Sequence, residues 1–224
     1  MTEINFSAIF NPESVAVVGA SEDEKKGGYR RFKPLVDNFK GRLYPVRPDK
    51  ETVFGIKCYP RVIDIPEEVD QVIISIPIRS VPSIIEDCIE KKVKVVMVFT
   101  AGYSESGEVE GKKREEELLK MVRRGGIRII GPNCIGVYCP QSGLAFSNGQ
   151  STEEGNVAFI AQSGGLAMKF SQFGTMYGIN FSKVVSFGNG ADIDFTDFLH
   201  YLAHDPHTDI ITAYLEGIRD GSKF

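Results

Sequence analysis

Short apolar runs rich in Val and Ile alternate along this sequence with longer polar stretches whose apolar residues have helical spacing. The runs are SVAVVGA (14–20), GRLYPVRP (41–48), QVIISIP (71–77), VKVVMVFTAGY (93–103) and IRIIGPN (127–133). Continuous apolar runs are typical of strands buried on both faces, as in parallel sheets. Alternation of such strands with helices predicts right-handed βαβ units in a doubly wound sheet. We therefore predict an α/β fold that opens with a Rossmann-like domain.

The strand–helix pattern restarts after a stretch rich in Ser, Gly and Gln, at 139–155, which is typical of a linker or a long connection. Three further strands are predicted beyond it, in NVAFIAQSGG, FSKVVSFGNG and TDIITAYLEG. We predict two domains, 1–140 and 150–224. Three strands make a small core, so the second, flavodoxin-like domain is expected to be incomplete and to continue past Phe224. Within the helix-like stretch 29–39, Pro34 is a candidate interruption.

The composition excludes several functional classes. A net charge of −4 argues against non-specific binding to nucleic acid or acidic membranes. No apolar run approaches the roughly 20 residues that a membrane span needs. The four cysteines form no CxxC pair, which disfavours a zinc site and favours reduced thiols in the cytoplasm. We predict a cytoplasmic protein without a metal site.

The first turn of the predicted sheet has the character of a nucleotide site, because ligands of open α/β sheets bind beyond the carboxyl ends of the strands. The turn is Gly19-Ala20-Ser21. The dinucleotide fingerprint G-x-G-x-x-G would require a glycine at position 21, where this chain has Ser21. A hydroxyl and backbone amides at a helix start can still hold a phosphate. Arg47 and Lys50 follow the second strand, where cations favour a phosphorylated ribose, as in NADP or coenzyme A. The alternative is that these two cations are solvated surface charges.

A second anion site is predicted in AFIAQSGGLAM, a strand, tight turn and helix. Ala161 replaces the first glycine of a nucleophile elbow, and no histidine is near it in sequence. Ser163, Gly164 and Gly165 instead present a hydroxyl and N–H groups at a helix start, where the dipole favours negative charge. The simpler alternative is that Ser163 only caps the helix.

All three histidines of the chain lie in HYLAHDPHTD, as His200, His204 and His207. The first two share a helix face, but an H-E-x-x-H metal site would need Glu where Tyr201 stands. Pro206 is expected to end the helix. We interpret the group as the end of a surface helix, towards the sheet edge opposite the strand carboxyl ends.

Seven stretches taken together resemble the α subunit of ADP-forming acid–CoA ligases. They are VAVVGAS, YPVRPDK, TAGYSE, GPNCIG, AQSGG, SFGNGADIDFTDFL and YLEGI, in order and across the whole chain. The sequence is most similar to the ADP-forming acetyl-CoA or acyl-CoA synthetases and more distantly to the succinyl-CoA synthetase α subunit. The resemblance implies that acyl-CoA, ADP and phosphate are interconverted with acid, CoA and ATP through an acyl phosphate and a phosphohistidine. It also implies an ATP-grasp partner subunit or fused domain that binds Mg-ADP or Mg-ATP.

The resemblance also implies which residues act. Those expected to contact the CoA phosphates are Gly19, Ala20, Ser21, Arg47 and Lys50. Those expected to line the rest of the CoA cleft are Ile76, Pro77, Thr100 and Ala101. The transferred phosphate is expected at Ser163, Gly164 and Gly165. Glu216, at the end of YLEG, would orient the phosphohistidine, which the resemblance places beyond Phe224.

Two other functions remain open at this stage. The chain could be a CoA-binding regulatory module without catalysis, and a homo-oligomer is compatible with either CoA-binding function. An NADP-dependent oxidoreductase fragment is disfavoured by Ser21 at the glycine position and by the second anion site, for which a reductase has no evident need.

Overall fold

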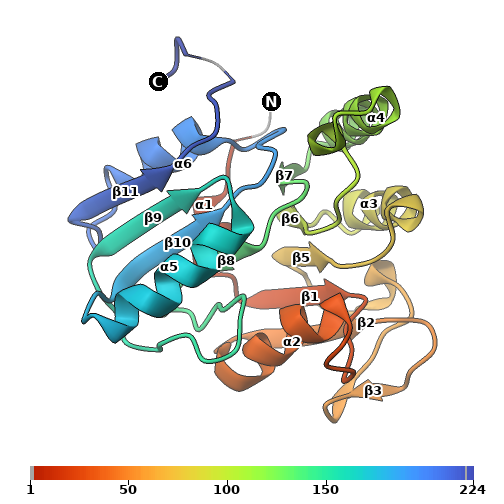
Figure 1. Ribbon diagram of the computed structural model, residues 1–224. Helices are drawn as coiled ribbons and strands as arrows, with labels where there is room; N and C mark the ends of the chain where they lie inside the picture. Colours follow the sequence, from red (N-terminus) through yellow and green to blue (C-terminus); the bar gives the residue numbers. More distant parts are fainter. Residues whose placement is uncertain (1–2, 220) are drawn as a thin grey trace.

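The computed structural model describes residues 3–219 and 221–224 as an α/β structure with two main sheets (Figure 1). Its α-helices are α1 (Phe6–Phe10), α2 (Gly27–Asn38), α3 (Val81–Glu90), α4 (Val109–Gly125), α5 (Gly164–Met176) and α6 (Phe195–Leu202). Its strands are β1 (Ser14–Val18), β2 (Arg42–Val46), β3 (Thr52–Val53), β4 (Ile56–Lys57), β5 (Gln71–Ile74), β6 (Val95–Val98), β7 (Arg128–Ile130), β8 (Gly136–Tyr138), β9 (Val157–Ala161), β10 (Phe181–Ser186) and β11 (Ile210–Tyr214). The predicted α/β class is confirmed. No helix among the described residues is long and apolar enough to cross a membrane.

The first sheet is parallel throughout, with the strand order β2-β1-β5-β6-β7. Successive side chains of each strand point to opposite faces. Val15 and Val17 of β1 pack in the core with α2 and with the second sheet. Ala16 and Val18 pack in a separate core with α3 and α4. Because both faces are covered, consecutive positions of the strands are apolar, with polar residues such as Ser14, Gln71 and Arg128 only at their first positions, and this explains the runs in the sequence.

The second sheet has the order β11-β9-β10-β8, with α5 and α6 on its opposite faces (Figure 1). Phe159 of β9 packs with α5, whereas its neighbour Ile160 packs with α6. The three strands predicted beyond residue 155 are present as β9, β10 and β11. The sheet also gains a fourth strand that was not foreseen, because β8, which precedes the segment 139–155, pairs antiparallel to β10. The three residues of β8 are too few to be recognised as a strand from their composition.

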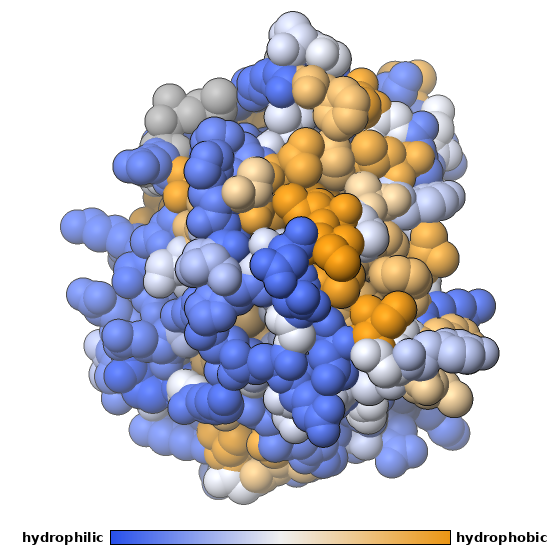
Figure 2. All heavy atoms as spheres, turned by 90° about the vertical axis from the view of Figure 1, so that its left-hand side faces the viewer, coloured by the Kyte–Doolittle hydropathy of each residue, from blue (hydrophilic) through white to orange (hydrophobic). Residues whose placement is uncertain are grey.

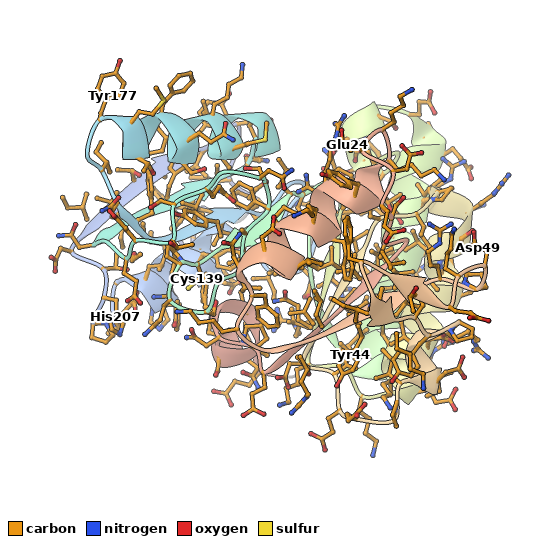
Figure 3. All side chains as sticks on the ribbon, turned by 90° about the horizontal axis from the view of Figure 1, so that it is seen from below. Glu24, Tyr44, Asp49, Cys139, Tyr177 and His207 are labelled. Carbon is orange, nitrogen blue, oxygen red and sulfur yellow. The ribbon has the colours of Figure 1, made fainter. Side chains whose placement is uncertain are left out.

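The segment 139–155 is a long connection, one of the two forms that its composition predicts, and part of it is buried. Cys139, Leu144 and Phe146 are buried, and Figure 3 shows Cys139 between the two halves of the molecule. The Ser142 hydroxyl donates to the carbonyl of Phe10 at 2.6 Å, which ties the segment to α1. The apolar triplet at 144–146 inserts into the core. Because the residues around it are mostly Ser, Gly and Gln, the average composition of the segment does not indicate that this triplet is buried.

A second connection joins the two sheets directly. Alternate N–H groups of the segment 189–193 donate to carbonyls of the segment 129–132, at 3.0 to 3.2 Å. The segment after β10 therefore runs beside the open edge of β7. The Asp192 carboxylate accepts from the Arg128 guanidinium at 2.9 Å, and both side chains are largely buried. The two sheets are thus held together by backbone pairing and by a buried ion pair.

Two elements were not foreseen, and one predicted break is absent. Phe6 and Phe10 of α1 stack on Tyr201 of α6, with ring centroids 4.3 and 5.1 Å apart, so the start of the chain packs against its second half. A short hairpin, β3–β4, follows β2. The helix α2 continues through Pro34, which is buried, rather than ending there.

We predict that the segment 139–155 contributes to stability through a close approach at Gly143. Its φ is +76°, and a Cβ there would lie 1.9 Å from the carbonyl oxygen of Asn38. Gly143→Ala should lower the free energy of unfolding by about 3 kcal/mol, since backbone strain adds to the clash. Gly149→Ala is the matched control, because Gly149 has φ +75° but open space around it, and it should cost about 1 kcal/mol. Equal losses in denaturant titrations of the two variants would show that the segment is not packed as described.

Candidate functional site

The carboxyl ends of six strands converge on one cleft between the two sheets, about 980 Å³ in volume. Three turns of the first sheet, after β5, β6 and β7, form one wall, and three turns of the second sheet, after β9, β10 and β11, form the other. The turns contribute residues 75–77, 99–101, 133–135, 162–165, 188–189 and 216–219. The cleft follows from topology, because parallel strands place all their carboxyl ends at one edge of a sheet.

The cleft brings together most of the residues that the sequence singled out. From the first sheet it includes Ile76, Pro77, Thr100 and Ala101, and from the second Ser163, Gly164, Gly165 and Glu216. The Thr100 hydroxyl donates to the Ile76 carbonyl at 2.7 Å and so joins two of the turns.

The start of α5 faces the cleft. Ser163 is its N-cap, and its hydroxyl accepts from the N–H of Leu166 at 3.3 Å. A Cβ at Gly164 would lie 2.5 Å from the Ile135 side chain, so the helix start can pack against the opposite wall only with glycine there. Within the described chain, the N–H groups of Gly164 and Gly165 have no acceptor. The capping role of Ser163 therefore holds and still leaves two amides for an anion.

Glu216 is held at the cleft through its backbone. The side chain of Gln162, which follows β9, accepts from the N–H of Glu216 at 2.9 Å and from that of Gly217 at 3.3 Å. The Glu216 side chain is exposed. Gln162 was not identified from the sequence as a functional residue, although it stands in the AQSGG motif.

The turn after β1 differs from the expected phosphate-binding turn. Ser21 is buried, and its hydroxyl accepts from the N–H of Asp23 at 3.0 Å. The helix α2 begins only at Gly27, after a long loop. Ser21 therefore does not lie in the first turn of this helix. Gly19 and Ala20 lie beside this loop rather than in the lining of the cleft.

Arg47 and Lys50 have different surroundings. The Arg47 guanidinium donates to both carboxylate oxygens of Asp49, at 2.7 and 2.5 Å, and to the Ala20 carbonyl at 3.1 Å. These hydrogen bonds raise the pKa of Arg47 and lower that of Asp49. Arg47 therefore ties the end of β2 to the turn after β1. Lys50 lines a separate hollow of about 490 Å³ and forms no ion pair in the described parts of the chain.

A polar network lies at the cleft wall and was not predicted from the sequence. The Asn189 side-chain amide donates to Glu105 at 2.6 Å and to Glu115 at 2.8 Å. The hydroxyl of Ser104 donates to Glu115 at 2.6 Å, and Arg219 donates to the same carboxylate at 2.9 Å. Asn189 and Arg219 come from the second half of the chain and the others from the first. The network forms because the segment 189–193 pairs with β7 and thereby brings the two halves of the chain together. The spacing of these residues in the sequence therefore does not indicate it.

The network keeps both carboxyl groups ionised. Burial opposes ionisation of Glu105, but hydrogen bonds from Asn189 and from the N–H groups of Gly102 and Tyr103 outweigh it and lower its pKa. Burial likewise opposes ionisation of Glu115, and Ser104, Asn189 and Arg219 together lower its pKa.

The histidines lie where the sequence placed them. His200 is in α6, and His204 and His207 follow it before β11 begins, so all three are near the amino end of that strand. All three are exposed, and Figure 3 shows His207 at the outer end of the second half. A ring nitrogen of His204 contacts the carbonyl of His200 at 2.9 Å. No cluster of potential metal ligands occurs in the described residues.

Comparison with known proteins matches two family models in succession. A model described as a CoA binding domain matches residues 13–140, and one described as a succinyl-CoA ligase like flavodoxin domain matches residues 154–224. The α subunit of acetate–CoA ligase [ADP-forming] II of Pyrococcus furiosus is 45% identical over 215 residues, covering 96% of this chain and 47% of that protein. Acetate–CoA ligase [ADP-forming] I of Archaeoglobus fulgidus is 42% identical and covers 96% of this chain and 31% of its own length.

A solved structure has the same arrangement. It is acetyl-coenzyme A synthetase 1 of Ca. Korarchaeum cryptofilum in complex with phosphate and ADP, with a TM-score of 0.91 and 39% identity. The alignment covers 98% of this chain and 47% of that chain. The chain thus spans half or less of the length of these relatives.

We predict an acid-dependent contribution of the Asn189 network to stability. Because the pKa values of Glu105 and Glu115 are lowered by folding, their stabilisation is complete above the ordinary glutamate pKa of 4.5 and is lost as pH falls through their folded values. Asn189→Ala should therefore reduce the melting temperature most at neutral pH, and the difference from the parent protein should shrink on acidification.

Thermal unfolding followed from neutral pH to about pH 3 measures this difference. Asn148→Ala, in an exposed turn, is the control and should show no such trend. A difference that stays constant over the whole pH range would contradict the role given to the two carboxylates.

Proposed function

The chain belongs to the CoA binding domain family, and from this premise we propose that it forms the CoA-binding part of an ADP-forming acid–CoA ligase. The observation that carries the proposal is the convergence of both sets of strand ends on one cleft. The turns of the CoA binding domain face the start of α5 across it. A ligand held by the first sheet and an anion held by α5 would therefore meet in the same space.

The residues present fit coenzyme A. The cleft, about 980 Å³, is at the upper end of the range for small-molecule sites, as a ligand of this length requires. The first turn of α2 has no side-chain cap, so its N–H groups can donate hydrogen bonds to an anionic group of the ligand. A Cβ at Gly19 would lie 2.5 Å from the carbonyl oxygen of Ser75, so only glycine allows this turn to approach β5 so closely. Bound CoA would supply the thiol that receives or releases the acyl group.

The second wall supports the phosphate chemistry that the proposal requires. The unpaired N–H groups of Gly164 and Gly165 lie at the positive end of the α5 dipole, so they are suited to stabilise a phosphate or acyl phosphate. We propose that Glu216 presents its exposed carboxylate to an imidazole that enters the cleft and fixes its tautomer. The chain's own histidines lie at the far end of the second sheet and do not meet this requirement.

The nucleotide and the phosphorylated imidazole would then come from outside the described residues. We propose an ATP-grasp domain, in a partner subunit or a fused segment, that binds Mg-ADP or Mg-ATP. Figure 2 shows an apolar band on the face formed by the second half. The second half has exposed large apolar side chains in α5, at the C-cap of α5 and in β11: Phe173, Met176, Tyr177, Ile210 and Tyr214. An exposed apolar surface of this kind supports contact with a further protein surface.

We propose that the chain divides into a CoA-binding domain at 1–140 and a ligase domain at 150–224.

The first test concerns the 3′-phosphate of CoA. Because Arg47 is engaged by Asp49, we expect Lys50 to supply the cation that this phosphate meets. By isothermal titration calorimetry, CoA should bind about tenfold more tightly than 3′-dephospho-CoA, since a charge-assisted contact is lost with the phosphate. Lys50→Met should bring the two affinities close together, whereas Lys112→Met, on the exposed face of α4, should leave their ratio unchanged. Equal affinities for the parent protein would refute the assignment of Lys50, and tighter binding of NADPH than of CoA would favour an oxidoreductase instead.

The second test removes one amide from the start of α5. Gly165→Pro deletes an N–H while keeping the helix, because the first turn tolerates proline and the space around Gly165 is open. Loss of a hydrogen bond to a charged group should weaken the binding of inorganic phosphate about tenfold. Gly165→Ala, which keeps the N–H, is the matched control. If both variants bind phosphate as the parent protein does, the anion site is not at this helix start.

A further inference from the structure

Buried charge in this protein is paired, with one exception. The charged side chains that are buried in the described chain are Arg31, Asp70, Asp87, Glu115, Arg128, Lys183 and Asp205. All but Arg31 lie in ion pairs, with N–O distances between 2.5 and 2.9 Å. Arg31 is 6% exposed and has no carboxylate within ion-pairing distance among the residues described. An unpaired buried charge is strongly unfavourable, so its presence needs a reason.

The contacts of Arg31 compensate the burial of its charge only in part. Its Nε is buried without a hydrogen-bond acceptor in the described structure, and one terminal nitrogen reaches the carbonyl of Ile135 at 3.4 Å. The guanidinium lies 4.7 Å from the centre of the Phe99 ring. Burial lowers the pKa of Arg31 to about 10, and the nearby Cys134 thiol and Arg30 have only smaller effects. The group thus remains a cation at neutral pH and lacks a counter-charge.

Its position connects this charge with the cleft. Phe99 and Ile135 both line the cleft, and the Ile135 side chain packs directly against Gly164 at the start of α5. Arg31 therefore lies behind the wall that faces the two free amides of Gly164 and Gly165. A charge acts more strongly through such a wall than through the same distance of water, because packed side chains have a lower dielectric constant. The buried cation and the positive end of the helix dipole act on the same space from two independent elements, α2 and α5.

We infer that Arg31 supplies the counter-charge for a phosphate dianion bound against the first turn of α5. The inference rests on the proposed function and adds a residue to it, one on the first half of the chain that acts on a site of the second. A dianion is the chemistry that fits, since it is neutralised by one guanidinium together with a helix start that offers two N–H groups. The free energy lost by burying an unpaired Arg31 is recovered when the anion binds.

The test is the binding of inorganic phosphate to the 224-residue chain by isothermal titration calorimetry. Arg31→Met removes the charge and keeps most of the apolar stem, and it should weaken phosphate binding about tenfold. Arg31→Lys keeps a cation and should retain most of the affinity. Arg30→Met is the matched control, because Arg30 is the exposed neighbour on the same helix, and it should bind phosphate as the parent protein does.

Thermal stability provides a second measurement. It distinguishes an arginine that supports the anion site from an arginine that serves only the packing of the fold. Without phosphate, Arg31→Met should melt at the same or a higher temperature than the parent protein, because an uncompensated buried charge has been removed. Saturating phosphate should raise the melting temperature of the parent protein more than that of the variant. If Arg31→Met melts lower and binds phosphate with unchanged affinity, Arg31 is a packing residue and the inference is wrong.

Titration with CoA separates this inference from the proposed function. One outcome is that CoA binds equally to the parent protein and to Arg31→Met, while the variant binds phosphate more weakly than the parent protein does. This outcome supports both the proposed function and the role of Arg31. If CoA binds but the phosphate affinity of the variant is unchanged, only the role of Arg31 fails. If the parent protein does not bind CoA, the proposed function fails, and the phosphate measurements still decide whether Arg31 supports an anion site.

Discussion

The pairing of the segment 189–193 with the open edge of β7 determines the geometry of the whole site. These hydrogen bonds, with the Asp192–Arg128 ion pair beside them, fix the second sheet against the first. The fixed contact brings the turn after β10 to the turn after β7, so that six strand ends surround one cleft. It also carries Asn189 to the two glutamates of the first half. Without the pairing, each sheet would have its own row of strand ends and neither would have a facing wall.

The charges around the cleft are arranged by wall. Asn189 donates hydrogen bonds to Glu105 and Glu115, and Arg219 forms an ion pair with Glu115, so the carboxylates of this network are gathered on one side of the cleft. At the start of α5, two amides have no acceptor in the described chain, and Arg31, which has no ion-pair partner there either, lies behind the wall that faces them. The field in the cleft therefore favours an anion at α5 and repels it from the glutamate side. A site of this kind is oriented before any ligand arrives, which is the condition for electrostatic stabilisation of developing charge.

The parts of this structure that could be predicted from sequence are those set by local pattern. Parallel strands buried on both faces give apolar runs, and the turns at their carboxyl ends give the positions of Thr100, Ser163 and Glu216 without further information. The contacts that depend on how two elements far apart in sequence meet could not be predicted. Arg47 has the residue type of a phosphate ligand, but in the fold its guanidinium donates to the carbonyl of Ala20, 27 residues earlier, as well as to its neighbour Asp49. Asn189 acquires its surroundings only from the packing of one sheet on the other. Gln162 and Arg31 instead meet residues that are far away in sequence but lie in the same half of the molecule.

The burial of the segment 139–155 bears on how a ligand enters. A covalent connection between lobes usually serves as a hinge when it is exposed, because few contacts resist its rotation. Here the connection lies in the core shared by α1 and both sheets, so the lobes cannot swing apart without breaking apolar contacts. Binding then needs little reorganisation free energy, and association is limited by encounter and orientation rather than by closure. Selectivity between ligands would accordingly reside in their residence times, since a rigid mouth admits competitors at similar rates.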